Sequence, residues 1–175
     1  MNMKYWQLIT SLVLLTVLFL TPLSAQSASS SSVTRSLLNE AGGEDFSGQI
    51  LIRAEFTNAT FKNTNFSNAD LRGALFNGVL LDGANLHGID FGSGIAYVSR
   101  FKDVDLSDAI LADTNMLRST FDNVDVTGAD FTNALLDMQQ VKKICIKASG
   151  INSKTGVDTR ESLAKKMRRL AAHLY

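Results

Sequence analysis

The chain has few of the residues on which enzymes and disulfide-bonded domains depend. Cys145 is the one cysteine in 175 residues, so no internal disulfide can form. The two histidines, His87 and His173, lie far apart in the sequence, and no cysteine or histidine spacing typical of a metal site occurs. A phosphate-binding glycine loop and a nucleophile elbow are also absent from the sequence. These absences argue against an enzyme, and we expect no catalytic residue, no metal and no cofactor.

Long apolar runs are scarce too, and the main one lies near the N-terminus. Lys4 precedes an apolar stretch from Leu8 to Leu20, which is short for a membrane-spanning helix of about 20 residues. Pro22 and several small residues follow it, and neither a twin arginine nor a lipobox cysteine is present. This layout predicts a secretory signal peptide over residues 1–28 and therefore an exported protein. An uncleaved membrane anchor is the alternative.

Charge is unevenly distributed along the chain, although 17 basic and 17 acidic residues balance overall. Residues 44–141 contain 14 acidic and 6 basic residues, a net charge of −8, whereas residues 142–175 contain 2 acidic and 9 basic residues, a net charge of +7. The acidic segment would repel phosphates, so we expect no direct binding of nucleic acid.

A period of five residues runs through the middle of the chain. Every fifth residue from 46 to 141 is apolar, and nine of the ten phenylalanines lie in this series. Residues five apart share neither a face of an α-helix nor one side of a flat strand, so the chain must change direction once per period. The series is Phe46, Leu51, Phe56, Phe61, Phe66, Leu71, Phe76, Leu81, Leu86, Phe91, Ala96, Phe101, Leu106, Leu111, Met116, Phe121, Val126, Phe131, Leu136 and Val141.

Two further columns explain the change of direction. Two residues before each apolar residue lies mostly a small or β-branched residue, and this spacing points both side chains inward in a strand. Two residues after it lies mostly Gly, Asn or Asp, which tolerate positive φ and tight turns. Each group of five therefore predicts a very short strand and a corner, and four corners close a square coil. Because Glu44, Gln49 and Gln139 are polar at inward positions, we expect the sealed core to run from about Ala54 to Leu136.

Several of these groups of five resemble a known repeat. The sequences NADLR (68–72), GANLH (83–87) and GADFT (128–132) resemble the A(D/N)LXX motif of the pentapeptide-repeat proteins. The resemblance covers about 100 of the 175 residues. It implies an all-β solenoid over residues 44–141, namely a right-handed quadrilateral β-helix of about five coils of 20 residues.

The terminal segments predict caps, because an open β-helix exposes unpaired backbone groups and an apolar terminal coil. Residues 29–43 form the N-terminal segment, in which Val33 to Leu38 is the candidate cap. Residues 142–175 form a C-terminal cap and an α-helical tail, and Asp158 and Glu161 have the spacing of a helix-capping box.

The predicted C-terminal helix is basic and amphipathic. Apolar residues such as Leu163 recur at helical intervals, and the other side carries the basic tail, Lys165, Lys166, Arg168 and Arg169. One interpretation is an end cap, and another is attachment to an anionic membrane surface or an acidic partner. The two are compatible, because one face can cover the rod while the other stays charged.

Outward residues that lie 20 apart form columns, and one face of the predicted square is apolar. Contiguous exposed apolar patches usually mark a partner site, and Tyr97 would lie at the centre of this one. Two alternatives remain: the N-terminal segment or the C-terminal tail covers this face, or its apolar residues have no role. The predicted partner patch consists of Leu75, Ile95, Tyr97, Val98, Leu117, Leu135 and Met138.

Two other features of the columns predict local structure. Ala96 is the one small residue in the central series, so either a cavity lies between Phe76 and Met116 or neighbouring side chains fill the space. Gly92 and Gly94 beside it indicate an irregular backbone. Aspartates 20 apart, at 70 and 90 and at 105 and 125, should stack on adjacent coils, where a solvated acidic face is favoured over a cation site.

The segment TGVDTRESL (155–163), which follows Cys145, resembles the C-terminal region of pentapeptide-repeat proteins of the thylakoid lumen. The cysteine pair that plant members hold there cannot form here, so Cys145 is interpreted as a small buried hydrophobic residue or as the site of an intermolecular bridge. The resemblance implies an exported scaffold or protein-interaction module in the thylakoid lumen or periplasm, with an unknown protein partner. It also leaves open an end-to-end homodimer and a DNA mimic that inhibits a topoisomerase.

Overall fold

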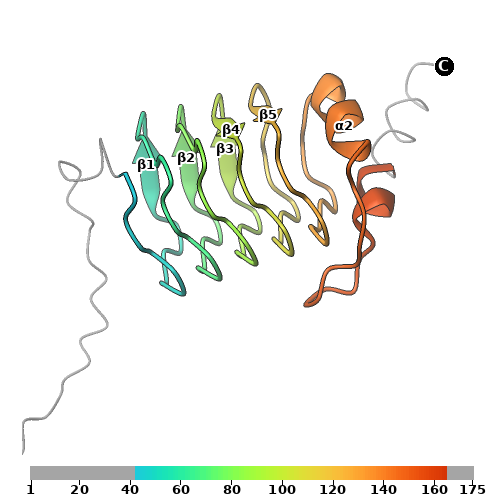
Figure 1. The fold of residues 1–175 in the computed structure, drawn as a ribbon, viewed down its shortest axis with the longest axis horizontal. Coiled ribbons are helices and arrows are strands. Elements are labelled where there is room, and N and C mark those ends of the chain that lie inside the picture. The colour runs from blue at the N-terminus through green and yellow to red at the C-terminus, as the bar shows by residue number, and fades with distance from the viewer. Residues whose placement is uncertain (1–41, 165–175) are drawn as a thin grey trace, which may run out of the picture. The chain divides into compact units, whose positions relative to one another are not determined.

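The computed structural model describes residues 42–164, which form a β-helix followed by a helical C-terminal segment (Figure 1). The strands are three residues long and parallel. One sheet contains β1 (Glu55–Thr57), β2 (Leu75–Asn77) and β3 (Ile95–Tyr97), and the other contains β4 (Arg100–Lys102) and β5 (Thr120–Asp122). Helix α2 (Met138–Cys145) follows, and a second helical segment begins at residue 159. The predicted signal peptide, the candidate cap at 33–38 and the basic tail lie outside the described residues.

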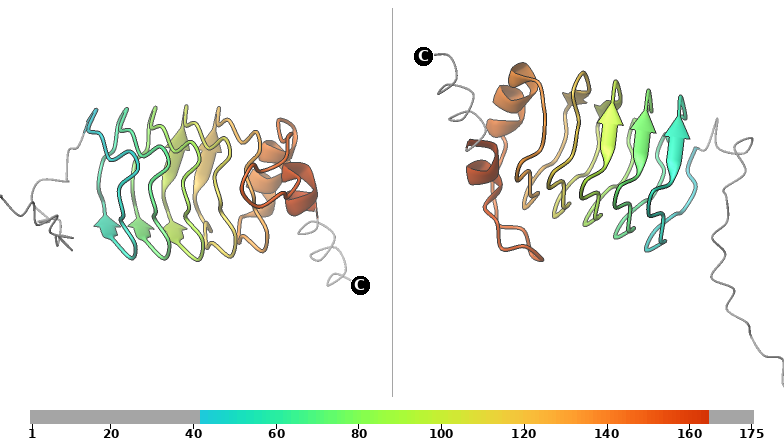
Figure 2. Two further views of the ribbon diagram at one scale, coloured as in Figure 1. Left: turned by 90° about the horizontal axis from the view of Figure 1, so that it is seen from below. Right: turned by 180° about the vertical axis from the view of Figure 1, so that it is seen from behind.

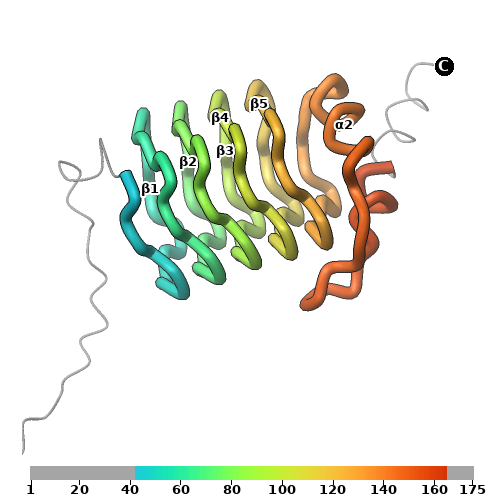
Figure 3. The backbone as a smooth tube through the Cα atoms, viewed as in Figure 1, coloured from blue at the N-terminus to red at the C-terminus, as the bar shows by residue number. Residues whose placement is uncertain are grey.

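The register of the sheets is 20 residues throughout. Strand pairs align Phe56 with Phe76 and Phe101 with Phe121, and isolated parallel bridges of the same register continue from Asp45 to Leu135. Figure 2 and the tube in Figure 3 show the resulting stack of coils, with α2 at its C-terminal end. The predicted period of four groups of five per coil is therefore confirmed.

The backbone hydrogen bonds explain why the motif places Asn or Asp before the central residue. In the group 65–69, the N–H groups of Asn65, Phe66 and Asn68 donate to carbonyls of adjacent coils, and that of Ala69 closes the corner on Phe66 at 2.9 Å. The remaining N–H, of Ser67, donates to the side-chain Oδ1 of Asn65 at 3.0 Å. The Asn or Asp side chain thus satisfies the one backbone donor that the ladder leaves over.

The corners repeat the same left-handed backbone conformation. Every fifth residue from Gly43 to Asn133 has a positive φ, which Gly, Asn and Asp adopt at low cost. The other residue types with positive φ are Arg53, Ser93, Val98 and Arg118.

The buried core extends beyond the predicted limits of Ala54 and Leu136. All central residues from Leu51 to Val141 are buried, whereas Glu44, Gln49 and Gln139 are exposed and Ala54 is half-buried. Rings that lie 20 apart pack directly on one another inside the rod. The centroids of Phe101 and Phe121, for example, are 4.7 Å apart with nearly parallel planes.

The β-helix gives way to a helix earlier than the repeat indicates. The prediction extended the rod to Val141, but α2 begins at Met138, so Val141 fills its inward position from a helix. The physical reason is local: the next corner lacks Gly, Asn and Asp, and its inward position holds the polar Gln139. Asp137 precedes the helix, and its carboxylate accepts the N–H of Arg118 at 2.7 Å.

Candidate functional site

The predicted partner patch lies on the face formed by β1, β2 and β3 and on the corner that follows it. The structure places Leu75 beside Ile95, and Leu135 continues that column beyond Asn115. Ile95, Val98 and Leu135 are 41%, 50% and 48% exposed, respectively. The other four members, Leu75, Tyr97, Leu117 and Met138, are half-buried. We call these seven residues the apolar wall.

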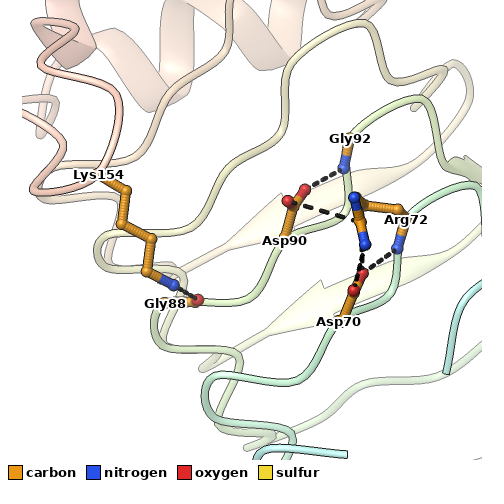
Figure 4. A network of polar contacts seen from close by, with 6 residues as sticks. All are labelled: Asp70, Arg72, Gly88, Asp90, Gly92 and Lys154. Atoms are coloured by element: carbon orange, nitrogen blue, oxygen red, sulfur yellow. Dashed lines mark hydrogen bonds and ion pairs between the residues drawn. The ribbon is translucent and has the colours of Figure 1, made fainter. Parts of the chain in front are cut away.

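The described part of the C-terminal segment does not cover the apolar wall. Its loop around Asn152 and Lys154 docks two faces away, on the corner column formed by Gly88, Asp108 and Gly128, while α2 contacts β5. The Nδ2 of Asn152 donates to the carbonyls of Asp108 and Gly128. The Nζ of Lys154 donates to the carbonyl of Gly88 at 2.6 Å, as Figure 4 shows. Within residues 42–164, the wall therefore faces solvent.

Val98 has a strained backbone in the middle of the wall. Its φ is 55°, and a β-branched side chain in this region of the backbone map is an outlier that costs roughly 1–2 kcal/mol. Its N–H reaches the carbonyl of Leu117 at 3.3 Å, which is longer than most ladder bonds of this rod. A Gly, Asn or Asp at this corner would fold more favourably, so folding alone does not explain the valine.

A cation lies beside the same corner. The guanidinium of Arg118 is 5.7 Å from the centroid of the Tyr97 ring, within cation–π distance. Arg118 is exposed, and no ion pair joins it to an acidic side chain among the described residues. The wall thus combines apolar surface with one positive charge.

Buried serines shape the corners next to the wall. The Oγ of Ser99 accepts the N–H of Val79 at 3.1 Å and donates to the carbonyl of Phe76 at 3.0 Å. The Oγ of Ser119 bridges the N–H of Ser99 and the carbonyl of Ala96 in the same way. At most other corners, the N–H of the inward residue donates directly to the carbonyl of the central residue three positions before it. At these two corners, a serine hydroxyl from the following coil lies between that donor and that acceptor.

The stacked aspartates lie on adjacent coils as predicted, and their charge is offset locally. Asp70 pairs in register with Asp90, and Arg72 lies between them, with bonds of 2.8 and 2.7 Å to the Asp70 carboxylate (Figure 4). The hydrogen bonds from Arg72 lower the pKa of Asp70 below its ordinary value. Asp125, stacked on Asp105, has a lowered pKa chiefly because the backbone N–H of Thr127 donates to it.

No group of three or more histidine, cysteine, aspartate or glutamate side chains within residues 42–164 is arranged to hold a metal ion. In the same part of the chain, no helix is long and apolar enough to cross a membrane. Cys145 is half-buried against the core, and desolvation raises the pKa of its thiol.

Ala96 is fully buried, and the space between Phe76 and Met116 is nearly filled. A cavity of about 10 Å³ remains there, and its lining residues include Phe76 and Met116 but not Ala96. The predicted backbone irregularity at Gly92 and Gly94 is wrong, because neither has a positive φ. A Cβ on Gly94 would instead lie 2.7 Å from the Phe91 ring, so this glycine makes room for the phenylalanine.

Sequence reasoning missed a second exposed apolar group, at the N-terminal edge of the rod. Ile50 and Ile52 are 78% and 44% exposed and flank the inward residue Leu51. The signal was present in the sequence, since both isoleucines occupy outward positions of a group of five in the first coil.

The family model for pentapeptide repeats matches residues 45–78, 63–92 and 99–137. The chain is 34% identical to a pentapeptide-repeat protein of known structure from the thylakoid lumen of Arabidopsis thaliana, with a TM-score of 0.60. That similarity covers 75% of this chain and 92% of the other.

A second relative is the chloroplastic thylakoid lumenal protein TL20.3 of Arabidopsis thaliana, which is 50% identical over 38 residues. The match covers 22% of this chain and 14% of TL20.3, so it spans about one seventh of that protein's length. Proteins built from this repeat are right-handed β-helices and are generally structural or interaction modules. The repeat motif, the 20-residue register and these similarities together show that the chain belongs to the pentapeptide-repeat family.

Proposed function

We propose that the protein is a non-enzymatic interaction module exported to the thylakoid lumen, and that the apolar wall binds a partner protein. Two similar proteins come from the thylakoid lumen of Arabidopsis thaliana, which supports the compartment. The N-terminal sequence has the layout of an export signal, which supports the route.

The observation that carries this proposal is the strained valine in the wall. Val98 costs stability at its corner and remains half-exposed, so its side chain gains nothing from the core of the rod. Strain of this kind is retained where function needs the residue, and stabilising substitutions there reduce function. A binding surface explains both the strain and the exposure.

The chemistry of the wall suggests the kind of partner. Apolar side chains supply the buried area, and Tyr97 offers a ring with a hydrogen-bonding tip. Arg118 adds a charge that a carboxylate can meet in bidentate geometry. We therefore expect a partner segment that is apolar and carries an acidic residue.

The experiment is site-specific photo-crosslinking in the native compartment, followed by mass spectrometry. A photo-reactive residue at Val98 should capture one partner reproducibly, and Ile95→Asp should abolish that capture. The matched control places the photo-reactive residue at Ile146, an exposed apolar residue at the end of α2. Equal capture at Val98 and Ile146, or no capture at Val98, would contradict the proposal.

A second measurement links the strain to binding. Val98→Asn should raise the free energy of unfolding by about 1 kcal/mol, because asparagine tolerates the left-handed region. The same variant should lose the crosslinked partner when the probe is moved to Tyr97. A more stable variant that keeps full binding would separate the strain from function.

We also propose that residues 138–164 cap the rod, which would then comprise about five coils. Val141, Ile144 and Leu163 are buried in the same core cluster as the phenylalanines. The side-chain Oε1 of Gln140 accepts the N–H of Phe121 at 3.1 Å, in place of a carbonyl from a following coil. Gln140→Leu should lower the thermal midpoint, and an unchanged midpoint would argue against capping at this position.

A further inference from the structure

The backbone beneath the apolar wall is already paired. The N–H groups of Ile95 and Ala96 donate to the carbonyls of Ala74 and Asn115, and β2 is paired with both of its neighbours, β1 and β3. Strand addition needs unpaired backbone groups at a sheet edge, and the wall is the face of a sheet. A partner therefore binds the wall through side chains.

The wall is long along the rod and narrow across it. One column of its side chains runs from Leu75 through Ile95 to Leu135, which is three steps of the 20-residue register. Adjacent strands lie about 4.8 Å apart, so this column is about 14 Å long. Across the rod, β3 presents Ile95 and Tyr97 outward, about 7 Å apart, before the corner at Val98 (Figure 1). The wall therefore has about the width of one α-helix, which measures about 10–12 Å with its side chains.

The spacing of the coils suits a helix that lies along the rod. An α-helix advances about 5.4 Å per turn, and the rod advances about 4.8 Å per coil. Over three steps the two repeats diverge by less than about 2 Å, so a helix can place one side chain per turn against each coil. Side chains on one face of an extended chain repeat about every 6.6 Å, and they lose the register of the coils within three steps.

One coil of the wall is polar. Asn115 lies between Ile95 and Leu135 in the column, and Arg118 occupies the corner of the same coil. The Oδ1 of Asn115 accepts the N–H of Leu117 at 3.2 Å, and its Nδ2 has no partner among residues 42–164. Both polar side chains are hydrogen-bond donors, and a carboxylate of the partner can accept from either.

A second copy of this protein fits the wall poorly. If two antiparallel rods met at Ile95, Leu75 of each would face Asn115 of the other. If they met at Asn115, the two Arg118 side chains would come together and repel each other. If the rods were parallel and related by a two-fold axis, Leu75 would face Asn77. Each arrangement opposes apolar with polar groups or like charges with each other, so a different protein is favoured.

Taking the apolar wall as the binding surface of the proposed function, we propose that its partner segment is an amphipathic α-helix of about three turns that lies along the axis of the rod. Apolar side chains of successive turns contact Leu75 and Ile95. A carboxylate one turn further on meets Arg118, and an apolar side chain beyond it contacts Leu135. Tyr97 packs against the side of the helix.

The experiment measures how far the contact moves along the partner from coil to coil. A photo-reactive residue replaces Leu75, Ile95 or Leu135 in three separate proteins in the native compartment, and mass spectrometry maps the crosslinked partner residues. A helix along the rod predicts a shift of about three or four residues from Leu75 to Ile95, and of about ten from Leu75 to Leu135. An extended segment predicts about four residues over the longer distance, and a segment that crosses the wall predicts one shared contact region.

The outcomes distinguish the helix from the proposed function. A shift of about four residues over the longer distance, or one shared contact region, would overturn the helix and leave the wall as a binding surface. No capture at any of the three positions would overturn both.

Reversal of the charge at Arg118 tests the carboxylate. Arg118→Glu should lower capture from Ile95 by about fivefold, the order expected for an exposed ion pair. Arg53→Glu is the matched control and should leave capture unchanged. Arg53 is also an exposed arginine at a left-handed corner, with a φ of 57° against 59° for Arg118, and it lies outside the apolar wall. Equal losses in the two variants would show an effect of net charge alone and would contradict a carboxylate opposite Arg118.

Discussion

Replacement of Ser99 by alanine tests whether an inserted hydroxyl holds a corner of the rod. The Oγ of Ser99 joins the N–H of Val79 to the carbonyl of Phe76, and the serine side chain is almost fully buried. Ser99→Ala removes this bridge and leaves a buried donor and a buried acceptor. The change in side-chain volume is small, so packing contributes little to the expected effect.

The loss of stability expected for Ser99→Ala depends on which hydrogen bonds the backbone can form again without the hydroxyl. An unsatisfied buried polar group costs about 1–3 kcal/mol. If the corner tightens, Val79 can donate directly to Phe76, as Ala74 does to Leu71 at 2.9 Å in the same coil. Tightening would form one direct bond between the N–H of Val79 and the carbonyl of Phe76, and this one bond would satisfy both groups. We therefore expect the free energy of unfolding to fall by about 1.5–3 kcal/mol, and not by the sum for two unsatisfied groups.

Urea denaturation followed by circular dichroism measures this loss as a shift of the midpoint at constant slope. Ser67→Ala is the matched control, because Ser67 lies at an outward position and its N–H, not its hydroxyl, is bonded to Asn65. We expect the control to change stability by less than about 0.5 kcal/mol. If Ser99→Ala were no less stable than Ser67→Ala, the inserted hydroxyl would have no structural role.

Three further predictions concern the core and the charged face. Ala96→Leu should lower the free energy of unfolding by about 1–3 kcal/mol, because a cavity of about 10 Å³ cannot hold three more carbons; an unchanged thermal midpoint would show that the core yields. Gly94→Ala should lower the thermal midpoint because its Cβ would lie 2.7 Å from the Phe91 ring, and a crystal structure with that ring unmoved would refute the reason. In acid titration, the lowered pKa of Asp70 means that its carboxylate stabilises the fold above the ordinary value of 3.8 and that this stability is lost as the pH falls through the lower folded value. Arg72→Gln should weaken the loss of thermal midpoint below about pH 4, and identical pH profiles would contradict the assignment.

The sequence predicted the architecture well, because the repeat is a direct record of the register. Each inward residue and each corner is set by contacts with residues five and 20 positions away, so the pattern carries the geometry. The polar residues Glu44 and Gln49 located the N-terminal limit of the buried core, whereas Val141 and Ile144 are buried beyond Gln139. The position and the exposure of the apolar wall were predicted from the outward residues that lie 20 positions apart.

Other features lay beyond the pattern because they depend on local competition between conformations. The start of α2 at Met138 reflects helix-forming residues that outweigh the repeat once the corner residue is missing. Gly94 has no turn to make, and its role becomes visible only when the Phe91 ring is placed. The roles of the Ser99 and Ser119 hydroxyls could not be predicted either, because the sequence pattern distinguishes a serine at an inward position only by its small size.

The 20-residue register also limits how this protein can change in length. A deletion or insertion of one to four residues would shift the corners away from their Gly, Asn and Asp residues. An insertion of five would keep every corner but rotate all later coils by about a quarter turn. Placed between β2 and β3, it would carry Ile95 and Tyr97 onto the neighbouring face, away from Leu75. The apolar wall can therefore lengthen or shorten without being broken only by whole coils of 20 residues.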